Sequence, residues 1–259
     1  MEYIDSIENK FIKKIRKLKS KKYRDSYSLF LGEGIKFVDF HYTPYAIIID
    51  KNAVFSKEHL EKLNSFITPK TYVSSKVFHS ITTQENPQGI IFVYEYLPNS
   101  IESLGDNIVV LNNISDPGNL GTIIRVVDAV GYKDILISKS SVDMYNEKTV
   151  RSSMGSILNV NINYMESDEI INLLKEKNYK VFATNLDKSS IDYKQMLLSD
   201  KNAYIFGNEA NGISDEMLNI SDEHIIIPMY GSAQSLNVSI ASAIILYKSR
   251  ELLEIFNQG

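Results

Sequence analysis

Apolar residues near the start of the chain recur with the spacing of a helix. Ile4, Ile7, Phe11, Ile15 and Leu18 lie three or four residues apart, which predicts one amphipathic helix. Short apolar runs follow it and alternate with helical patterns. They predict strands at 28–31, 46–50, 71–73 and 89–96 and short helices at 33–40, 57–64 and 75–80. The first hundred residues therefore predict a small α/β domain.

The alternation restarts after residues 97–106, where Pro, Asn, Ser and Gly give the turn chemistry of a domain boundary. Strands are predicted at 108–112, 135–138, 160–164, 180–184, 204–206 and 224–228. Helices are predicted at 120–130, 147–153, 168–177, 215–219 and about 238–256. Strands that alternate with crossover helices predict a mostly parallel sheet covered on both faces. We expect two domains, 1–98 and 107–259, joined by a linker at 99–106.

The composition narrows the class of protein. Of the 259 residues 44% are apolar and 23% charged, as in ordinary globular proteins. The chain has no cysteine, which excludes disulfides, thiolate zinc sites and a Cys nucleophile, and its four histidines lack ligand spacing. No apolar run approaches the roughly 18 residues of a membrane span, and the start does not resemble a secretory signal. We expect a soluble, cytoplasmic protein without a metal or a membrane partner.

Charge is distributed unevenly along the chain. Residues 10–24 contain nine Lys or Arg and no acid. Residues 1–104 carry 15 basic and 12 acidic side chains, and residues 105–259 carry 13 and 20. The basic front half predicts a surface that binds a polyanion, although a run of charges is often only a solvated helix face.

Three segments of the second half do not have the pattern of ordinary core, and the first is 113–125. It follows a predicted strand and opens a helix, and Pro117, Gly118 and Gly121 predict a tight turn. Asn119 lies near the helix N-cap, and Arg125 is nearly two turns further on. A turn, a cap and a surface arginine would account for these residues equally well. Gly118 and Gly121 also have the GxxG spacing of KH domains, but the flanking pattern does not fit.

The second segment is 203–214, where a buried strand ends at Gly207 and continues into a polar loop. The loop contains Glu209, its only acid, and a second glycine, Gly212. Loops at the ends of parallel strands are where ligands bind. A loop that merely turns the chain is the alternative.

The third segment, 227–243, begins where Pro228 ends a strand and continues through small polar residues into a long helix. Ser235 or Asn237 can cap that helix. The cap explains one of these two polar residues but not both. Small residues at 241–243 allow another element to pack closely.

Together the three segments place five polar side chains at successive strand ends, without a nucleophile and base pair. They are Asn119, Arg125, Glu209, Ser235 and Asn237. The chain lacks a Ser-His-Asp set, an HExxH motif, a Walker A loop and a GxGxxG before a helix. The residues alone therefore predict a site that handles an anion or a hydroxyl group at the strand ends of the second domain.

The order of these segments resembles the SpoU/TrmH family of the SPOUT superfamily over residues 105–259. The family's first motif matches Asn119 and Arg125, and its second matches Gly207, Glu209 and Gly212. The third, Ile-Pro-Met-x-Gly-x-x-x-Ser-Leu-Asn-Val, matches 227–238 residue for residue. Residues 148–155 resemble the family's basic Arg-x-Ser-x-Gly stretch.

The first half resembles the L30e-like substrate-binding domain that precedes many of these enzymes. The matching residues are 17–24, Glu33 with Gly34, and Pro87 to Ile90. This arrangement is typical of a subgroup associated with large-subunit ribosomal RNA. The resemblance implies an L30e-like α/β domain followed by a SPOUT α/β domain with a deep C-terminal trefoil knot, a rare exception to the usual chain-threading rule.

The resemblance implies an S-adenosyl-L-methionine-dependent RNA methyltransferase that modifies a ribose 2′-hydroxyl. The resemblance to the subgroup implies that this ribose lies in large-subunit ribosomal RNA. The family members are homodimers packed through the helices of the knotted domain, with RNA bound across both subunits. A tRNA methyltransferase of the same family is one alternative. A catalytically silent RNA-binding or ribosome-assembly protein is another. The cofactor contacts carried onto this chain are Thr184, Gly207, Asn208, Gly212, Ile227, Met229 and Leu236.

Methyl transfer from a sulfonium needs the acceptor hydroxyl positioned and one proton managed. A guanidinium does not deprotonate readily, so we expect Arg125 to hold a phosphate and stabilise negative charge developing on the oxygen. Asn119, Ser235 and Asn237 would orient ribose or Arg125, and Glu209 would pair with Arg125 or fix the loop. The predicted RNA contacts are Lys13, Lys14, Arg16, Lys17, Lys21, Lys22, Arg24 and Arg151.

Overall fold

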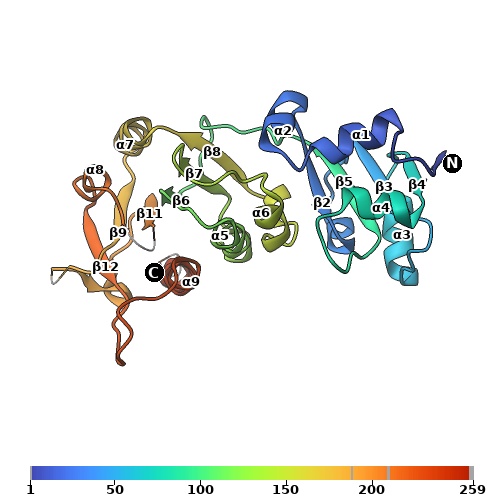
Figure 1. Cartoon of the computed structure of the whole chain (residues 1–259). Coiled ribbons are helices and arrows are strands. Elements are labelled where there is room, and N and C mark those ends of the chain that lie inside the picture. The colour runs from blue at the N-terminus through green and yellow to red at the C-terminus, as the bar shows by residue number, and fades with distance from the viewer. Residues whose placement is uncertain (1, 188, 209–210, 257–259) are drawn as a thin grey trace. The chain divides into compact units, whose positions relative to one another are not determined.

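The computed structural model describes residues 2–187, 189–208 and 211–256. They form two compact units, each built around one sheet (Figure 1). The first unit consists of Met1–Leu97 with Met144–Leu158, and the second of Pro98–Asp143 with Asn159–Gly259. Met144–Leu158 thus packs with the first unit although it lies within the stretch predicted as the methyltransferase domain. The predicted domain boundaries stay a prediction.

The first unit has a mixed five-stranded sheet in the order β1-β4-β3-β5-β2, in which β1, β3 and β4 are parallel and β5 is antiparallel to its neighbours β3 and β2. Its helices α1, α2 and α4 contact one another or the sheet around an aliphatic core, and α3 contacts the 3₁₀ helix η1. The strands are β1 (Glu2–Ile4), β2 (Leu29–Glu33), β3 (Ala46–Asp50), β4 (Lys70–Val73) and β5 (Ile90–Glu95). The helices are α1 (Lys10–Lys17), α2 (Lys21–Tyr27), η1 (Ile35–Asp39), α3 (Lys57–Ser65), α4 (Ser75–Ile81), α6 (Glu147–Ser152) and η2 (Ser156–Leu158).

The prediction of one helix beginning at Ile4 is wrong. Residues Glu2–Ile4 pair with β4, and α1 begins only after Asn9, whose side-chain oxygen accepts a hydrogen bond from Phe11 N at 2.8 Å. Ile4 and Ile15 are buried in the same core, reached from a strand and from a helix. Their helical spacing therefore reflects one shared core and not one element.

The residues that carry the L30e resemblance hold loops in place. The Glu33 carboxylate accepts hydrogen bonds from Thr82 Oγ1 at 2.6 Å and from Thr83 N at 3.0 Å, which fixes the chain after α4. The Gln88 side chain accepts from Ile35 N at 2.8 Å. Glu33 and Gln88 therefore have a structural role: their hydrogen bonds fix loops of the first unit.

The second unit has a seven-stranded sheet in which every pairing is parallel, in the order β10-β12-β9-β11-β6-β7-β8. The predicted α/β class with a mostly parallel sheet is confirmed. The knot stays a prediction. The strands are β6 (Asn107–Asn112), β7 (Asp134–Ser138), β8 (Asn161–Met165), β9 (Lys180–Thr184), β10 (Ile191–Asp192), β11 (Asn202–Gly207) and β12 (Glu223–Ile226).

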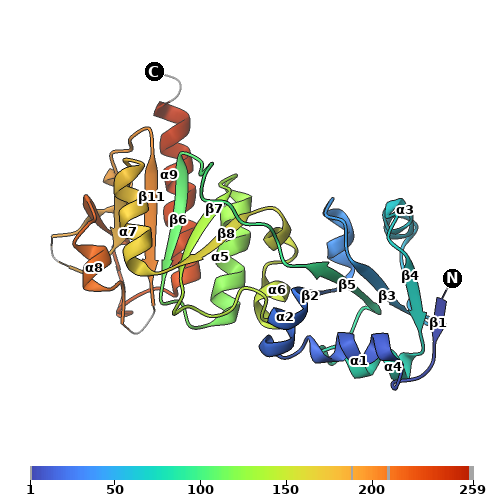
Figure 2. The same ribbon diagram turned by 90° about the horizontal axis from the view of Figure 1, so that it is seen from above.

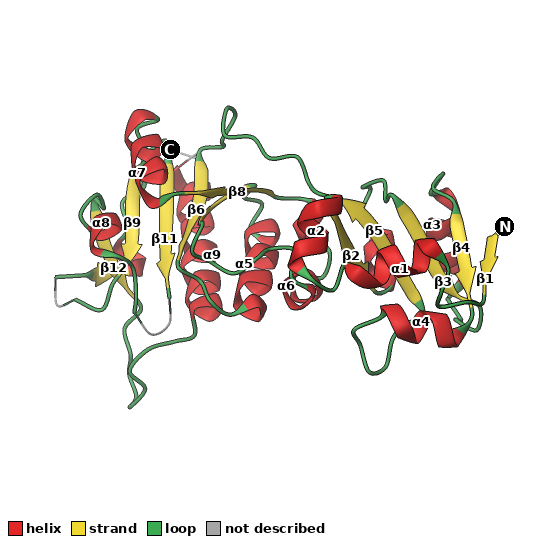
Figure 3. Ribbon diagram, turned by 45° about the horizontal axis from the view of Figure 1, so that its top comes forward, coloured by secondary structure: helices red, strands yellow, loops and turns green. Residues whose placement is uncertain are grey.

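Helices cover both faces of this sheet (Figures 2 and 3). On one face α5 (Pro117–Ala129) packs against α9 (Val238–Phe256), and on the other α7 (Ser167–Glu176) packs against α8 (Asp215–Leu218); the 3₁₀ helix η3 (Tyr193–Gln195) also contacts α9. The Tyr204 ring of β11 stacks on Tyr132 and on Phe182, and the Tyr132 hydroxyl lies 2.7 Å from Ser249 Oγ of α9. Burial raises the pKa of Tyr204 and of Tyr132, so both phenols stay neutral, and Tyr132 anchors α9 through Ser249.

A membrane span is not found among the described residues, since none of their helices combines the necessary length and hydropathy. The same residues contain no group of three or more His, Cys, Asp or Glu side chains able to hold a metal ion.

Candidate cofactor pocket and acceptor site

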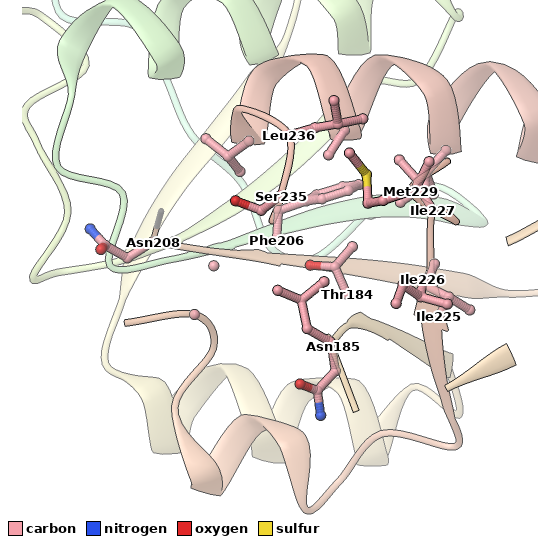
Figure 4. Close-up of a pocket in the computed structure, with 16 residues that line it drawn as sticks. Thr184, Asn185, Phe206, Asn208, Ile225, Ile226, Ile227, Met229, Ser235 and Leu236 are labelled. Atoms are coloured by element: carbon pink, nitrogen blue, oxygen red, sulfur yellow. The ribbon is translucent and has the colours of Figure 1, made fainter. Parts of the chain in front are cut away.

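A cavity of about 220 Å³ lies where β9, β11 and β12 end and α9 begins (Figure 4). Parallel strands bring their carboxyl ends to one edge of a sheet, and the loops that follow line the cavity. All seven residues predicted as cofactor contacts line it: Thr184, Gly207, Asn208, Gly212, Ile227, Met229 and Leu236. Their role as cofactor contacts remains a proposal. Ser235, predicted as a catalytic residue, lines the same cavity.

The chemistry of the lining fits an adenosine-type group. Side chains such as Ile227, Met229 and Leu236 give an apolar slot, as flat rings require, and Gly207, Asn208 and Gly212 lie at its edge. Of the described side chains that line the cavity, none is ionisable at neutral pH. A cationic sulfonium would therefore meet no buried positive charge there.

Two glycines allow the loop after β11 to close on itself. Asn208 N donates to Gly212 O at 3.0 Å, and Gly212 N donates to Asn208 O at 2.8 Å. A Cβ on Gly207 would lie 2.4 Å from the backbone of Gly212, too close for any side chain, and Gly212 has a φ of +68°. The spacing of the two glycines is thus set by backbone approach. Glu209 lies outside the described residues.

The same loop is tied to the first motif segment. The Asn208 side-chain amide donates to Asn113 O at 3.0 Å and to Ser115 Oγ at 3.1 Å. The buried Asn112 side chain accepts from Ser214 N at 2.9 Å. The end of β6 and the end of β11, neighbours in the sheet, therefore hold each other's loops.

An asparagine pair joins the first and third motifs. Asn237 caps α9, because its Oδ1 accepts hydrogen bonds from Ser239 N at 2.9 Å and Ser239 Oγ at 2.6 Å. Its Nδ2 donates to Asn119 Oδ1 on α5 at 3.0 Å. The predicted cap is therefore Asn237, and its amide also links the N-terminal ends of two helices beside the cavity. The N-cap of α5 itself is Asp116, which accepts from Asn119 N at 2.8 Å.

This double use predicts different outcomes for two substitutions at one position. Asn237→Asp keeps the capping oxygen but replaces the donor to Asn119, so we expect stability near that of the wild type and a fall in turnover. Asn237→Ala removes both functions and should also cost about 1 kcal/mol of stability. Chemical denaturation and single-turnover methyl transfer measure the two effects. Equal destabilisation by both variants would contradict the assignment of the cap.

Among the predicted catalytic residues that the structure describes, Ser235 lines the cavity, the Asn119–Asn237 pair lies beside it, and Arg125 neither lines it nor bonds to that pair. Arg125 lies on α5, is exposed, and has no hydrogen-bond or ion-pair partner among the residues described. The free guanidinium is therefore available to a ligand from outside its own chain.

The predicted RNA contacts have different environments. Lys14 and Lys17 lie over tyrosine rings, Lys13 pairs with Glu8, and Lys21 Nζ lies 2.9 Å from Asp25 Oδ2. Lys22 and Arg151 are exposed, and Arg16 is half-buried. All of these lie in the first unit, Arg151 through its place on α6.

Arg24 does not fit the prediction. Its side chain is 5% exposed, and its Nη1 donates to the carbonyl oxygens of Leu18 and Lys19 at 3.0 and 3.1 Å. It joins the end of α1 to α2, and its guanidinium is therefore not available to bind RNA. A run of charges can contain both exposed cations and a buried, structural one such as Arg24, and the sequence pattern does not distinguish them.

The sequence analysis missed several residues that line the cavity. Three of them, Val238, Ala241 and Ile245, lie on one face of α9 at spacings of three and four. Their helical spacing is the signal by which these three residues could have been predicted. The others are Asn185, Leu186, Phe206, Ile225 and Ile226.

Comparison with known proteins agrees with this geometry. Residues 106–247 match the SpoU rRNA Methylase family, and residues 9–91 match the MRM3-like substrate binding domain. These matches, with the relatives that follow, make the chain an RNA methyltransferase that takes its methyl group from S-adenosylmethionine and transfers it to a ribose 2′-hydroxyl.

Relatives and solved structures extend the match to the whole chain. The chain is 31% identical to the 23S rRNA (guanosine(2553)-2′-O)-methyltransferase RlmP of Bacillus subtilis (strain 168), over 96% of this chain and 100% of the relative. It is 35% identical to the tRNA (guanosine(18)-2′-O)-methyltransferase of Thermus thermophilus, over 56% of this chain and 74% of that protein. The AdoMet-bound rRNA methyltransferase from Sinorhizobium meliloti superposes with a TM-score of 0.85 at 30% identity, covering 97% and 98% of the two chains. The chain belongs to the SpoU rRNA methylase family.

Proposed function

We propose that this enzyme methylates a ribose 2′-hydroxyl of large-subunit ribosomal RNA. The observation that carries the proposal is the extent of the similarity. The relative that acts on 23S rRNA aligns over its entire length and so includes the first unit, whereas the similarity to the tRNA enzyme is confined to little more than half of this chain. The match to the MRM3-like substrate binding domain, residues 9–91, includes the basic helix α1.

The residues in and beside the cavity have separate roles in the reaction. S-adenosylmethionine, when bound, supplies an activated methyl group on a sulfonium. We propose that Gly207, Asn208 and Gly212, together with the apolar side chains Ile227, Met229 and Leu236, hold it. Ser235 and the Asn119–Asn237 pair lie where α9 begins, next to this slot, and orient the acceptor ribose by hydrogen bonds.

Arg125 would hold the phosphate next to the acceptor ribose and stabilise negative charge on its oxygen. Because it does not line the cavity of its own chain, we propose that the active enzyme is a homodimer in which Arg125 serves the partner's cavity. The support is the outer face of α9, where Ile240 and Tyr247 are each 52% exposed and Ile244 lies between them. An apolar stripe of this kind at helical spacing is typical of a subunit interface. We place the enzyme in the cytoplasm with its substrate.

The target class is tested by transfer of radiolabelled methyl groups to RNA from a strain that lacks the gene. We expect label in large-subunit ribosomal RNA and background in tRNA, each fraction assayed separately with the full chain. Label in tRNA alone would retain the enzyme and overturn the target. Cofactor binding without transfer to any RNA would favour a silent RNA-binding protein.

A further inference from the structure

Aromatic rings alternate with lysines on the surface formed by α1, α2 and the residue before β3. We name Tyr23, Tyr27, Tyr45, Lys14 and Lys17 the tyrosine–lysine strip. The Lys14 ammonium lies 5.2 Å from the Tyr27 ring centroid and 5.1 Å from that of Tyr45, and the Lys17 ammonium lies 5.0 Å from that of Tyr23. Tyr23 and Tyr27 stack at 6.1 Å. The strip is thus continuous.

The strip is accessible in part although α1 is anchored beneath it: Lys17 and Tyr45 are exposed, whereas Lys14, Tyr23 and Tyr27 are half-buried. Ile12 and Ile15 are buried in the core, which turns Lys14 and Lys17 outward. Tyr45 is 47% exposed, and its backbone N donates to Val93 O at 2.7 Å, which fixes its backbone at the start of β3. A lysine–ring contact at an exposed site stabilises only weakly, so a phosphate can readily draw the ammonium away.

From this arrangement we propose that the tyrosine–lysine strip binds an unpaired stretch of the RNA substrate, with nucleobases stacked on the tyrosines and phosphates on Lys14 and Lys17. This assignment rests on the proposed function, methylation of RNA. Bases in a duplex hide their faces, so a surface that binds duplex RNA needs cations but no rings. Alternating rings and cations are what single strands require.

The geometry around Tyr45 supports a base in particular. The centroids of Tyr27 and Tyr45 are no more than about 10 Å apart, because Lys14 lies near both. A surface hollow lined by Tyr42, Pro44 and Glu95 also borders Tyr45. The Glu95 carboxylate disfavours a phosphate in that hollow but not an uncharged base.

The chain contains a matched control for Tyr45. Tyr3 is 51% exposed and also has a lysine over its ring, with Lys51 Nζ at 5.5 Å. Tyr3 pairs with Tyr72, which pairs on its other side with Ile49, four residues beyond Tyr45. It is therefore about 13 Å further along the strand direction, outside the strip. A general effect of losing one exposed tyrosine and its lysine contact would be equal at both positions.

The experiment measures binding of a fluorescein-labelled oligouridylate, and of a duplex RNA with the same number of phosphates, to the full chain and its variants. We expect Tyr45→Leu to weaken oligouridylate binding at least about fivefold while leaving duplex binding within about twofold. Tyr45→Phe should bind as the wild type does, and Tyr3→Leu should change neither RNA. Lys14→Met should reduce the salt dependence of oligouridylate binding by about one phosphate contact.

Two results would overturn the assignment. Equal losses for Tyr45→Leu and Tyr3→Leu, or equal losses with oligouridylate and duplex, would leave the strip a merely basic surface. Thermal unfolding of each variant separates these results from a folding defect. The readout is independent of methyl transfer: loss of Tyr45-dependent binding with intact transfer to ribosomal RNA refutes this inference alone. Absence of transfer with Tyr45-dependent binding refutes the proposed target alone.

Discussion

Replacing Arg125 by alanine should lower turnover by about 10²–10³-fold, the size of effect seen when one charge-stabilising donor is removed from an active site. Affinity for S-adenosylmethionine should stay within about twofold of the wild type, because Arg125 does not line the cavity. Arg125→Lys should recover only part of the rate, since an ammonium keeps the charge but not the two-pronged grip on a phosphate. Single-turnover kinetics and calorimetric titration with the cofactor measure the two quantities. A matching loss of cofactor affinity would contradict this role.

Mixed dimers test whether Arg125 acts on the partner's cavity. When an inactive Arg125→Ala chain is unfolded and refolded with an inactive cavity variant, random pairing should restore about a quarter of the wild-type activity. Each mixed dimer then contains one intact site, made of one chain's arginine and the other chain's cavity. If each chain used its own arginine, the mixture would stay inactive.

The second large effect is expected at Gly207, where any side chain must displace backbone. A Cβ there would lie 2.4 Å from the carbonyl carbon and oxygen of Gly212 and 2.5 Å from Ile213 N. None of these atoms can rotate away, so Gly207→Ala must open the 208–212 loop. Overpacking of this kind costs about 1–3 kcal/mol, and we expect at least a tenfold loss of cofactor affinity. Titration of the purified variant with S-adenosylmethionine measures it.

Gly231→Ala is the matched control for that substitution. Gly231 lies in the loop between Met229 and Ser235, and a Cβ there meets no atom within 4 Å. The control should bind the cofactor as the wild type does. If both alanine variants bound it normally, the close approach of the two glycines would have no part in forming the cavity.

The sequence predicted most of the second unit because its signals are local. Buried parallel strands show as short apolar runs, and the limits predicted for β9 and α9 agree with the structure. Residues with a local steric role, such as Gly207, or a capping role, such as Asn237, could also be predicted from the sequence. Their positions follow from the backbone and are visible in the order of residues.

Features that depend on distant contacts could not be predicted. The short helix α2 has no apolar periodicity, and β1 is a strand only because β4 offers an edge to pair with. Likewise Arg24 has the same sequence environment as the lysines around it, yet its guanidinium caps the end of α1. The hydrogen bond between Asn237 and Asn119 joins residues 118 positions apart and appears only once α5 and α9 pack. Contacts of this kind depend on the tertiary structure and leave no signal in the order of residues.

The measurement that tests the account most directly is the identity of the methylated nucleoside. Large-subunit ribosomal RNA from a strain lacking the gene is incubated with the full chain and labelled S-adenosylmethionine, digested to nucleosides and separated. We predict that the label appears in a single 2′-O-methyl nucleoside, and that its RNA dinucleotide resists alkali. Arg125→Ala should incorporate at least about a hundredfold less label in the same time. Label on a base, or label that is unchanged in the Arg125→Ala variant, would contradict the site and the reaction described above.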